Sequence, residues 1–140
     1  MNYPYGNSIF ITGASSGIGH AAAMAFARAG YKVFAAARSC NDETHGNITS
    51  IRMDVTDELS VLRAKEVVAA RGGVGIILNC AGLRIEGAAE DAKEEDIRYL
   101  FDVNYFGVLR VNRIFMPMLR ERGHGLVLIV SSLAGQIPLP

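Results

Sequence analysis

The stretch "FITGASSGIGHAAAMAFARAG", Phe10 to Gly30, joins an apolar run to an alanine-rich pattern through a turn rich in glycine and serine. The apolar run, Ser8–Thr12, is typical of a buried strand. The pattern after the turn, Ile18–Ala29, is typical of a helix, and Gly30 follows where a helix end favours a left-handed residue. The packed face of this helix is expected to use Ile18, Ala22, Met24 and Phe26. This order of elements predicts the start of an α/β fold.

The composition is that of an ordinary globular protein, with 140 residues, 50% of them hydrophobic and 20% charged. This length fits one compact domain, 1–140. Fourteen Lys and Arg balance fourteen Asp and Glu, so no basic field favours nucleic acid or an anionic membrane as a partner. The N-terminus does not resemble a signal peptide, and no apolar run reaches the roughly 20 residues that span a bilayer. Because Cys40 and Cys80 form no metal or redox spacing, we expect a cytoplasmic protein without a metal site.

Strands and helices are expected to alternate along the rest of the chain. Four further strands are predicted at Val33–Ala37, Ile48–Met53, Gly75–Asn79 and Leu126–Val130, with a loop over Ser39–Asn47. Helices are predicted from an N-cap at Thr56 or Asp57 to Arg71, and over Lys93–Arg122, where Pro117 is expected to loosen the last turns. This alternation favours a Rossmann-type, doubly wound parallel sheet with strand order 3-2-1-4-5. Ligands of such sheets bind beyond the carboxyl ends of the strands.

The glycine-rich turn after the first strand predicts a site for phosphate groups. A helix N-terminus presents unsatisfied N–H groups and the positive end of its dipole. Gly13, Gly17 and Gly19 permit close backbone approach because they lack Cβ atoms, and Ser15 and Ser16 add hydroxyl donors. A dinucleotide pyrophosphate suits this chemistry. The alternative is a tight strand–helix turn that uses glycine for its geometry alone.

Five sequence motifs follow one another along the chain: "TGASSGIG" at 12–19, "DVTD" at 54–57, "NCAG" at 79–82, "FDVNYFG" at 101–107 and "LVLIVSSLAG" at 126–135. The first matches the T-G-x-x-x-G-x-G cofactor motif of the short-chain dehydrogenase/reductase family, and the others match family motifs at similar spacing. The chain therefore resembles the classical branch of this family as far as its fifth strand. The resemblance implies a nicotinamide dinucleotide cofactor and hydride transfer to or from a carbonyl or secondary alcohol, without indicating a substrate.

The resemblance also implies which positions contact the cofactor. The pyrophosphate turn would be lined by Gly13, Gly17, Ile18 and Gly19. Asp54 would face the adenine through its carboxylate, and Val55 through its backbone. Asn79, Ala81 and Gly82 would flank the ribose and brace the sheet, although Asn79 could instead be a structural turn residue. Cys80 stands where the family more often has a second asparagine, so weaker local hydrogen bonding is expected.

The end of the second strand distinguishes NADP from NAD. An acid there would pair with the 2′-hydroxyl of the ribose and repel a 2′-phosphate. The sequence has Ala37 and Arg38 instead, with no acid before Asp42. Because a planar guanidinium suits a phosphate, Arg38 favours NADP over NAD. The alternative for Arg38 is a solvated surface side chain.

Part of a catalytic group is implied by the same resemblance. Ser132 matches the serine that hydrogen-bonds the developing alkoxide. Asn104, expected to be buried in the long helix, matches the asparagine that positions a water in the proton relay. The proton-donating tyrosine, with a lysine four residues later, has no counterpart among the five tyrosines. Since losing a general acid lowers the rate by about 10²–10⁴-fold, this chain by itself is expected to bind cofactor poorly and turn over little.

Three functional hypotheses are compatible with these observations. The first is an enzyme whose sequence continues beyond Pro140 into the tyrosine and lysine. The second is a nucleotide-binding module without chemistry. The third is a subunit whose site is completed by a partner chain.

Self-association is also expected. The family continues with further elements that cover the fifth strand, so Leu126–Val130 would be an apolar edge here. On the long helix, Phe106, Leu109, Ile114 and Phe115 would lack part of their cover. Such surfaces favour pairing with another chain, so we expect a homo-oligomer.

The first hypothesis predicts that the native polypeptide is heavier than the 15.1 kDa of these 140 residues. Intact mass spectrometry of the protein from its source cells checks this. A greater mass is the expected result. A mass of 15.1 kDa would contradict the first hypothesis and favour the module or the subunit.

Overall fold

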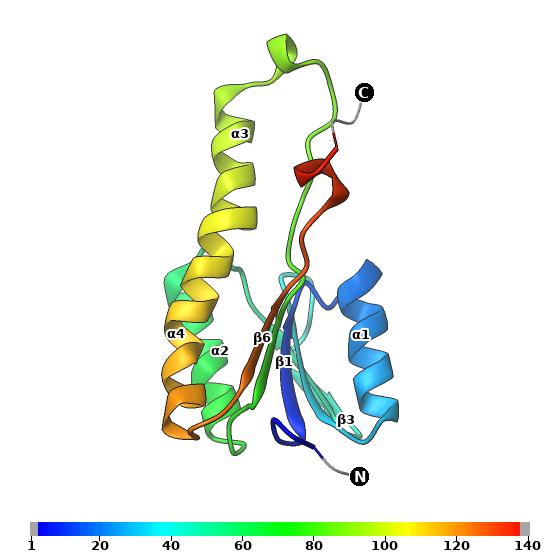
Figure 1. Cartoon of the computed structure of the whole chain (residues 1–140), viewed down its shortest axis with the longest axis vertical. Coiled ribbons are helices and arrows are strands. Elements are labelled where there is room, and N and C mark those ends of the chain that lie inside the picture. Colours follow the sequence, from blue (N-terminus) through cyan, green and yellow to red (C-terminus); the bar gives the residue numbers. More distant parts are fainter. Residues whose placement is uncertain (1–2, 138–140) are drawn as a thin grey trace.

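The computed structural model describes residues 3–137, apart from the side chain of Ala89. The predicted domain, 1–140, also includes residues 1–2 and 138–140, which lie outside the described residues. The described part is an α/β fold in which a six-stranded sheet is covered by helices on both faces (Figure 1). The predicted fold class is confirmed.

The strands of the sheet are β1 (Ser8–Thr12), β2 (Lys32–Ala37), β3 (Glu43–His45), β4 (Ile48–Arg52), β5 (Ile76–Asn79) and β6 (Leu126–Ile129). They lie in the order β3-β4-β2-β1-β5-β6, and every neighbouring pair is parallel except β3 and β4. The five strands predicted from the sequence keep the order 3-2-1-4-5 within this sheet. The difference is the added edge strand, β3.

The prediction of a loop over Ser39–Asn47 is therefore wrong in part. β3 lies within this segment and pairs antiparallel with β4, with the hydroxyl oxygens of Thr44 and Thr49 lying 3.3 Å apart across the pair. All three residues of β3 are exposed, so no buried face leaves an apolar periodicity in the sequence.

The helices are α1 (Gly17–Arg28), α2 (Glu58–Ala69), α3 (Glu94–Phe101) and α4 (Gly107–Glu121), with a π-helical turn, Asp102–Phe106, between α3 and α4. Asp57 caps α2 as predicted, because its Oδ1 accepts a hydrogen bond of 2.9 Å from the N–H of Leu59. α4 continues through Pro117, the residue at which a kink or local loosening is predicted from the sequence. Pro117 lies on the exposed side of α4, where solvent can satisfy the carbonyl that loses its donor.

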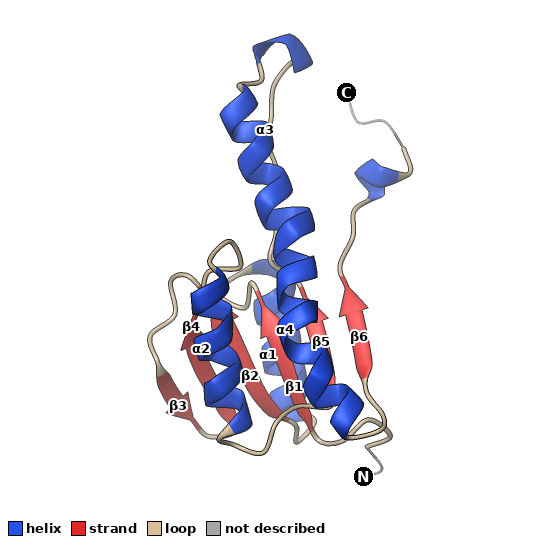
Figure 2. Ribbon diagram, turned by 90° about the vertical axis from the view of Figure 1, so that its left-hand side faces the viewer, coloured by secondary structure: helices blue, strands red, loops and turns tan. Residues whose placement is uncertain are grey.

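Side chains of the central strands alternate between the two faces of the sheet. Phe10 and Phe34 join the apolar cluster under α2 and α4, whereas Ile9 and Val33 join the cluster under α1. Figures 1 and 2 show α1 on one face and α2 with α4 on the other. Because both faces are covered, the central strands β1, β2 and β5 are rich in apolar residues.

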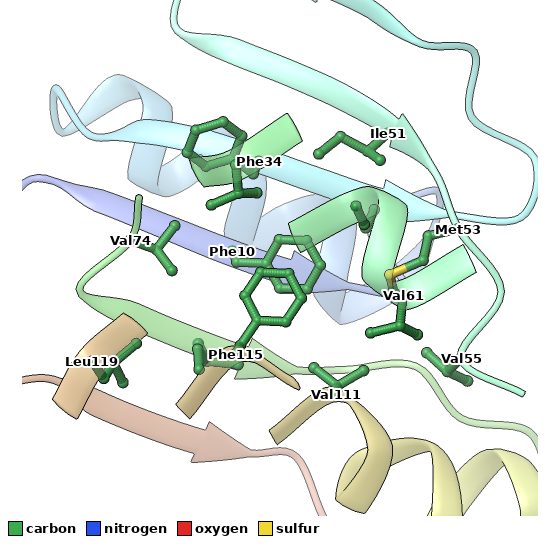
Figure 3. Packing of buried hydrophobic residues seen from close by; sticks show 14 of the residues in the cluster. Phe10, Phe34, Ile51, Met53, Val55, Val61, Val74, Val111, Phe115 and Leu119 are labelled. Atoms are coloured by element: carbon green, nitrogen blue, oxygen red, sulfur yellow. The ribbon is translucent and has the colours of Figure 1, made fainter. Parts of the chain in front are cut away.

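Two stacked phenylalanine rings lie at the centre of the larger cluster. Phe10 of β1 and Phe115 of α4 have ring centroids 4.2 Å apart and an interplanar angle of 23°, and both are 0% exposed (Figure 3). The expectation that Phe115 lacks cover is therefore wrong, because its ring packs on β1 in the interior. Ile114 also packs partly against this cluster, but Phe106 and Leu109 are 51% and 49% exposed.

Two segments of the chain project beyond the carboxyl edge of the sheet. α3 and the segment after β6 both continue beyond the ends of the strands (Figures 1 and 2). Ile129, at the end of the edge strand β6, is 57% exposed. Within residues 3–137, no helix combines the length and apolar character needed to cross a bilayer.

Candidate cofactor site

A cavity of about 1030 Å³ opens at the carboxyl edge of the sheet, among the turns that follow β1, β2, β4 and β5. This volume is at the upper end of the roughly 300–1,000 Å³ of typical ligand pockets. All the predicted cofactor-binding residues except Asn79 line the cavity: Gly13, Ser15, Ser16, Gly17, Ile18, Gly19, Arg38, Asp54, Val55, Ala81 and Gly82. The fold thus brings residues from four strand ends into one place.

The glycine turn after β1 has no room for a side chain at Gly13 or Gly19. A Cβ atom on Gly19 would lie 2.3 Å from the carbonyl oxygen of Gly13, and one on Gly13 would lie 2.8 Å from the backbone of Ala81. Gly13 also has φ +66°, a conformation that L side chains rarely adopt. At these two glycines the turn therefore brings main chain without side chains to the cavity, which fits the close approach of a pyrophosphate.

Thr12 joins this turn to the one after β5. Its side chain is buried, and its Oγ1 accepts hydrogen bonds from the N–H groups of Cys80 at 3.1 Å and Ala81 at 3.0 Å. Thr12 is not among the site residues predicted from the sequence. The available signal was its position as the first residue of the "TGASSGIG" motif.

α1 begins in the wall of the cavity, at Gly17. Ser16 is its N-cap residue, with φ −156°, and its side chain makes no capping hydrogen bond within the described part of the chain. The first turn of α1 holds no acidic residue. The main-chain N–H groups and the positive end of the helix dipole therefore favour an anion at this position.

The predicted packed face of α1 is wrong at two positions. Ala22 and Phe26 pack against the apolar cluster as expected, but Ile18 and Met24 are 64% and 38% exposed. Ile18 lies in the first turn, beyond the end of the sheet, so its side chain lines the cavity instead of the core.

Arg38 and Asp54 bring opposite charges to the cavity. Arg38 directly follows β2, is exposed, and forms no ion pair with any residue in the range 3–137. Oδ1 of Asp54 accepts hydrogen bonds from the N–H and the hydroxyl of Thr56, at 2.9 Å and 2.8 Å. These bonds hold the carboxylate in place at the end of β4.

Val55 is held by an arginine of α4. Nη1 of Arg110 donates a hydrogen bond to the carbonyl of Val55, and its Nη2 lies 3.0 Å from Oδ1 of Asp102. The side chain of Arg110 is 18% exposed, so this pair is less screened by solvent than a surface ion pair. Arg110 is not among the predicted site residues, because its contact with Val55 spans 55 residues and no local pattern marks it.

Asn79 lies outside the cavity, although it was predicted to flank the ribose. It is 3% exposed, and its Nδ2 donates to Oδ1 of Asn112 at 3.1 Å and to the carbonyl of Leu128 at 3.4 Å. Its Oδ1 is buried and has no hydrogen-bond partner among the described residues. The structure therefore places the side chain of Asn79, the last residue of β5, against β6 and α4.

Asn104 lies in the π-helical turn and bonds to the loop after β5. Its Oδ1 accepts a hydrogen bond of 2.9 Å from the N–H of Leu83, and its Nδ2 donates one of 2.8 Å to the carbonyl of Leu83. The expected burial of Asn104 is wrong, because the residue is exposed, whereas its neighbour Val103 is the buried residue of this turn. Since a side-chain amide has two donors and two lone pairs, one of each remains for a water.

Ser132 lies outside the cavity lining. It is exposed, and its Oγ accepts a hydrogen bond of 3.2 Å from the N–H of Ala134, which caps a 3₁₀ turn at Leu133–Gly135. Val130, two residues earlier, does line the cavity. The structure therefore brings this end of the chain to the cavity but not the predicted serine.

The cavity also contains residues that the sequence analysis did not predict as site residues, among them Ser39, Met53, Cys80, Leu83, Arg84 and Val103. Most of them are next in the sequence to a predicted site residue, and this position is the signal that could have identified them. Burial raises the pKa of the Cys80 thiol, so Cys80 presents a neutral sulfur to the cavity.

Comparisons with known proteins agree with this geometry. The sequence matches the short chain dehydrogenase family over residues 7–140. It is 33% identical to a 3-ketodihydrosphingosine reductase of Bacteroides thetaiotaomicron over 133 residues, and the aligned region covers 94% of this chain and 49% of that protein. It is 35% identical to an NADPH-dependent 1-acyldihydroxyacetone phosphate reductase of Schizosaccharomyces pombe over 136 residues. The aligned region covers 93% of this chain and 46% of that protein.

A solved structure supports the same relationship. A short-chain dehydrogenase from Streptomyces avermitilis superposes with a TM-score of 0.85 at 36% identity, over 94% of this chain and 51% of that one. The chain therefore belongs to the short-chain dehydrogenase family, a family of NAD(P)-dependent oxidoreductases. It spans about half the length of the curated relatives that it matches.

A substitution at Gly13 tests the close approach of the two turns. Gly13→Ala combines a strained φ of +66° with a Cβ atom 2.8 Å from the Ala81 backbone. We expect it to lower the free energy of unfolding by about 2–5 kcal/mol and to abolish dinucleotide binding.

The matched control is Gly46→Ala, at φ +59° with no atom within 4 Å of the added Cβ. It should cost about 1–2 kcal/mol and leave binding intact. Urea unfolding and dinucleotide titration measure both quantities. Equal losses of stability in the two variants would show that the close approach of Gly13 to Ala81 adds no constraint beyond the positive φ.

Proposed function

We propose that residues 1–140 form a single dinucleotide-binding domain that takes NADP into the cavity at the carboxyl edge of the sheet. The observation that carries this proposal is the pairing, in one cavity, of the glycine turn at the start of α1 with Arg38 directly after β2. Main-chain N–H groups at the glycine turn suit a pyrophosphate. The guanidinium of Arg38 suits a 2′-phosphate, because it combines positive charge with several donors.

The residues between these two positions suit the nucleoside. Asp54 and Val55 line the cavity, and hydrogen bonds from Thr56 and Arg110 restrain them. We propose that they hold the adenine, and that Ala81 and Gly82 lie against a ribose. Asn79 would support the same turn from inside the sheet and not by contact with the cofactor.

The reaction proposed for the whole protein is that of a reductase or dehydrogenase acting on a carbonyl or secondary alcohol. A bound nicotinamide cofactor would supply the hydride exchange. Both curated relatives described above are named as reductases, and the name of one specifies NADPH. We propose that Ser132 stabilises the developing alkoxide and that the amide of Asn104 holds a water for proton transfer.

A second candidate function is nucleotide binding without chemistry, or a subunit whose site a partner chain completes. One observation favours it. The Ser132 hydroxyl accepts a hydrogen bond within its own turn and lies outside the cavity lining. Binding without turnover would support the module, whereas turnover after addition of a second chain would support the subunit.

Fluorescence titration of the 140-residue chain with NADPH and NADH tests the cofactor proposal. We expect tighter binding of NADPH. Arg38→Ala should raise the Kd for NADPH by about 10- to 100-fold and leave NADH nearly unchanged, because hydrogen bonds to charged groups contribute about 1.5–3 kcal/mol.

The control for this titration is Arg120→Ala, an exposed arginine of α4 outside the cavity lining. It should leave the affinity for both cofactors unchanged. The NADP assignment would be contradicted if the unaltered chain bound NADPH and NADH with equal affinity. It would also be contradicted if Arg38→Ala lowered the affinity for both cofactors equally.

We also propose that the chain self-associates through the sheet edge formed by β6. Leu128 and Ile129 of this strand are 38% and 57% exposed, and Val130, directly after it, is 40% exposed. Apolar edge strands favour pairing with a second chain, because their main-chain groups are unpaired on one side.

Sedimentation velocity over a range of concentrations checks self-association. We expect dimers or larger species, and a shift toward monomer in Ile129→Lys, because a charge at the edge opposes strand pairing. A single monomeric species at high concentration would contradict this proposal.

A further inference from the structure

α3 contributes a side chain to the strand end that carries Arg38. Nη1 of Arg38 donates a hydrogen bond of 2.6 Å to the hydroxyl oxygen of Tyr99, although the two residues are 61 positions apart in the sequence. Tyr99 lies in α3, which continues beyond the carboxyl edge of the sheet (Figure 2). The contact therefore joins this helix to the end of β2.

We propose that Tyr99 is a positioning residue for NADP, which holds the Arg38 guanidinium ready for the 2′-phosphate. This inference rests on the NADP assignment proposed above. It adds a specificity-determining residue from an element outside the cofactor motifs.

The chemistry of the Tyr99 hydroxyl suits this role. The phenol is neutral, so it orients the guanidinium without cancelling its charge. A guanidinium has five N–H donors, and the bond to Tyr99 uses one of them, so the others remain for a phosphate. An acidic partner would also hold the side chain, but it would repel the phosphate.

The main chain at this position is fixed, so the freedom of Arg38 lies in its side chain. The carbonyl of Ala37, the preceding residue, accepts hydrogen bonds from the N–H groups of Met53 at 3.1 Å and Cys40 at 3.3 Å. The long side chain loses rotamer entropy when a ligand immobilises it. A hydrogen bond that exists before binding reduces this loss, and so favours the ligand that Arg38 contacts.

Tyr99 acts through Arg38 in this proposal and not by touching the cofactor. It is 40% exposed and is absent from the set of described residues that line the cavity. Its effect on affinity should therefore depend on the 2′-phosphate, which distinguishes NADPH from NADH.

Tyr99→Phe tests the inference, because it removes the accepting oxygen and keeps the ring. We expect the Kd of the 140-residue chain for NADPH to rise about 2- to 10-fold, with NADH unchanged. In an Arg38→Ala background, Tyr99→Phe should have no further effect on NADPH, as a double-mutant cycle requires of a residue that acts through its partner. The control is Tyr105→Phe, the same chemical change in the adjoining π-helical turn and outside the cavity lining, which should alter neither affinity.

Each other outcome overturns the role of Tyr99. If Tyr99→Phe leaves the affinity for NADPH unchanged while Arg38→Ala lowers it, Tyr99 has no positioning role, and the NADP assignment is unaffected. Tighter NADPH binding would show that the phenol competes with the phosphate. Equal losses for NADPH and NADH would show an effect independent of the 2′-phosphate. No preference for NADPH in the unaltered chain overturns the NADP assignment and this role together.

Discussion

The close approach of two turns, one after β1 and one after β5, is the constraint on which the site depends. A Cβ atom on Gly13 would meet the backbone of Ala81 at 2.8 Å, and the Thr12 hydroxyl accepts hydrogen bonds from the amides of Cys80 and Ala81. Because the strands are parallel, their carboxyl ends meet at one edge, and these contacts hold two of those ends together. The result is a cavity whose wall includes the glycines of this turn and the start of α1.

The helical segment from α3 through α4 forms a second frame around the same edge. Along it, Tyr99 contacts Arg38, Asn104 contacts Leu83, and Arg110 contacts Val55. Three turns that belong to different strands are therefore tied to one nearly continuous helix. The stacking of Phe115 on Phe10 in turn fixes α4 against β1, the strand that leads into the glycine turn (Figure 3). Displacement of this helix relative to the sheet would disturb all three contacts.

The two ends of the cavity differ in how the protein supports them. At the glycine turn, the shape follows from steric exclusion of side chains, and the turn is anchored to β2 by a hydrogen bond from the Ala14 N–H to the Ala36 carbonyl. At Arg38, the shape depends on a long exposed side chain whose position is set by one hydrogen bond. The first arrangement suits a group that every dinucleotide carries. The second suits a group that distinguishes one dinucleotide from another.

The sequence by itself determined the fold class, the order of the five parallel strands and the residues that line most of the cavity. These features depend on local patterns: apolar runs, the glycines that follow the first strand, and motifs that end at successive strand termini. The tertiary structure decided the rest. β3 is exposed and leaves no periodic signal, Phe115 is buried because β1 lies beneath it, and Asn79 and Asn104 each bond to partners that their own motifs do not contain. The contacts of Arg110 and Tyr99 span 55 and 61 residues, so they exist only because packing of α3 and α4 brings those side chains to the ends of the strands.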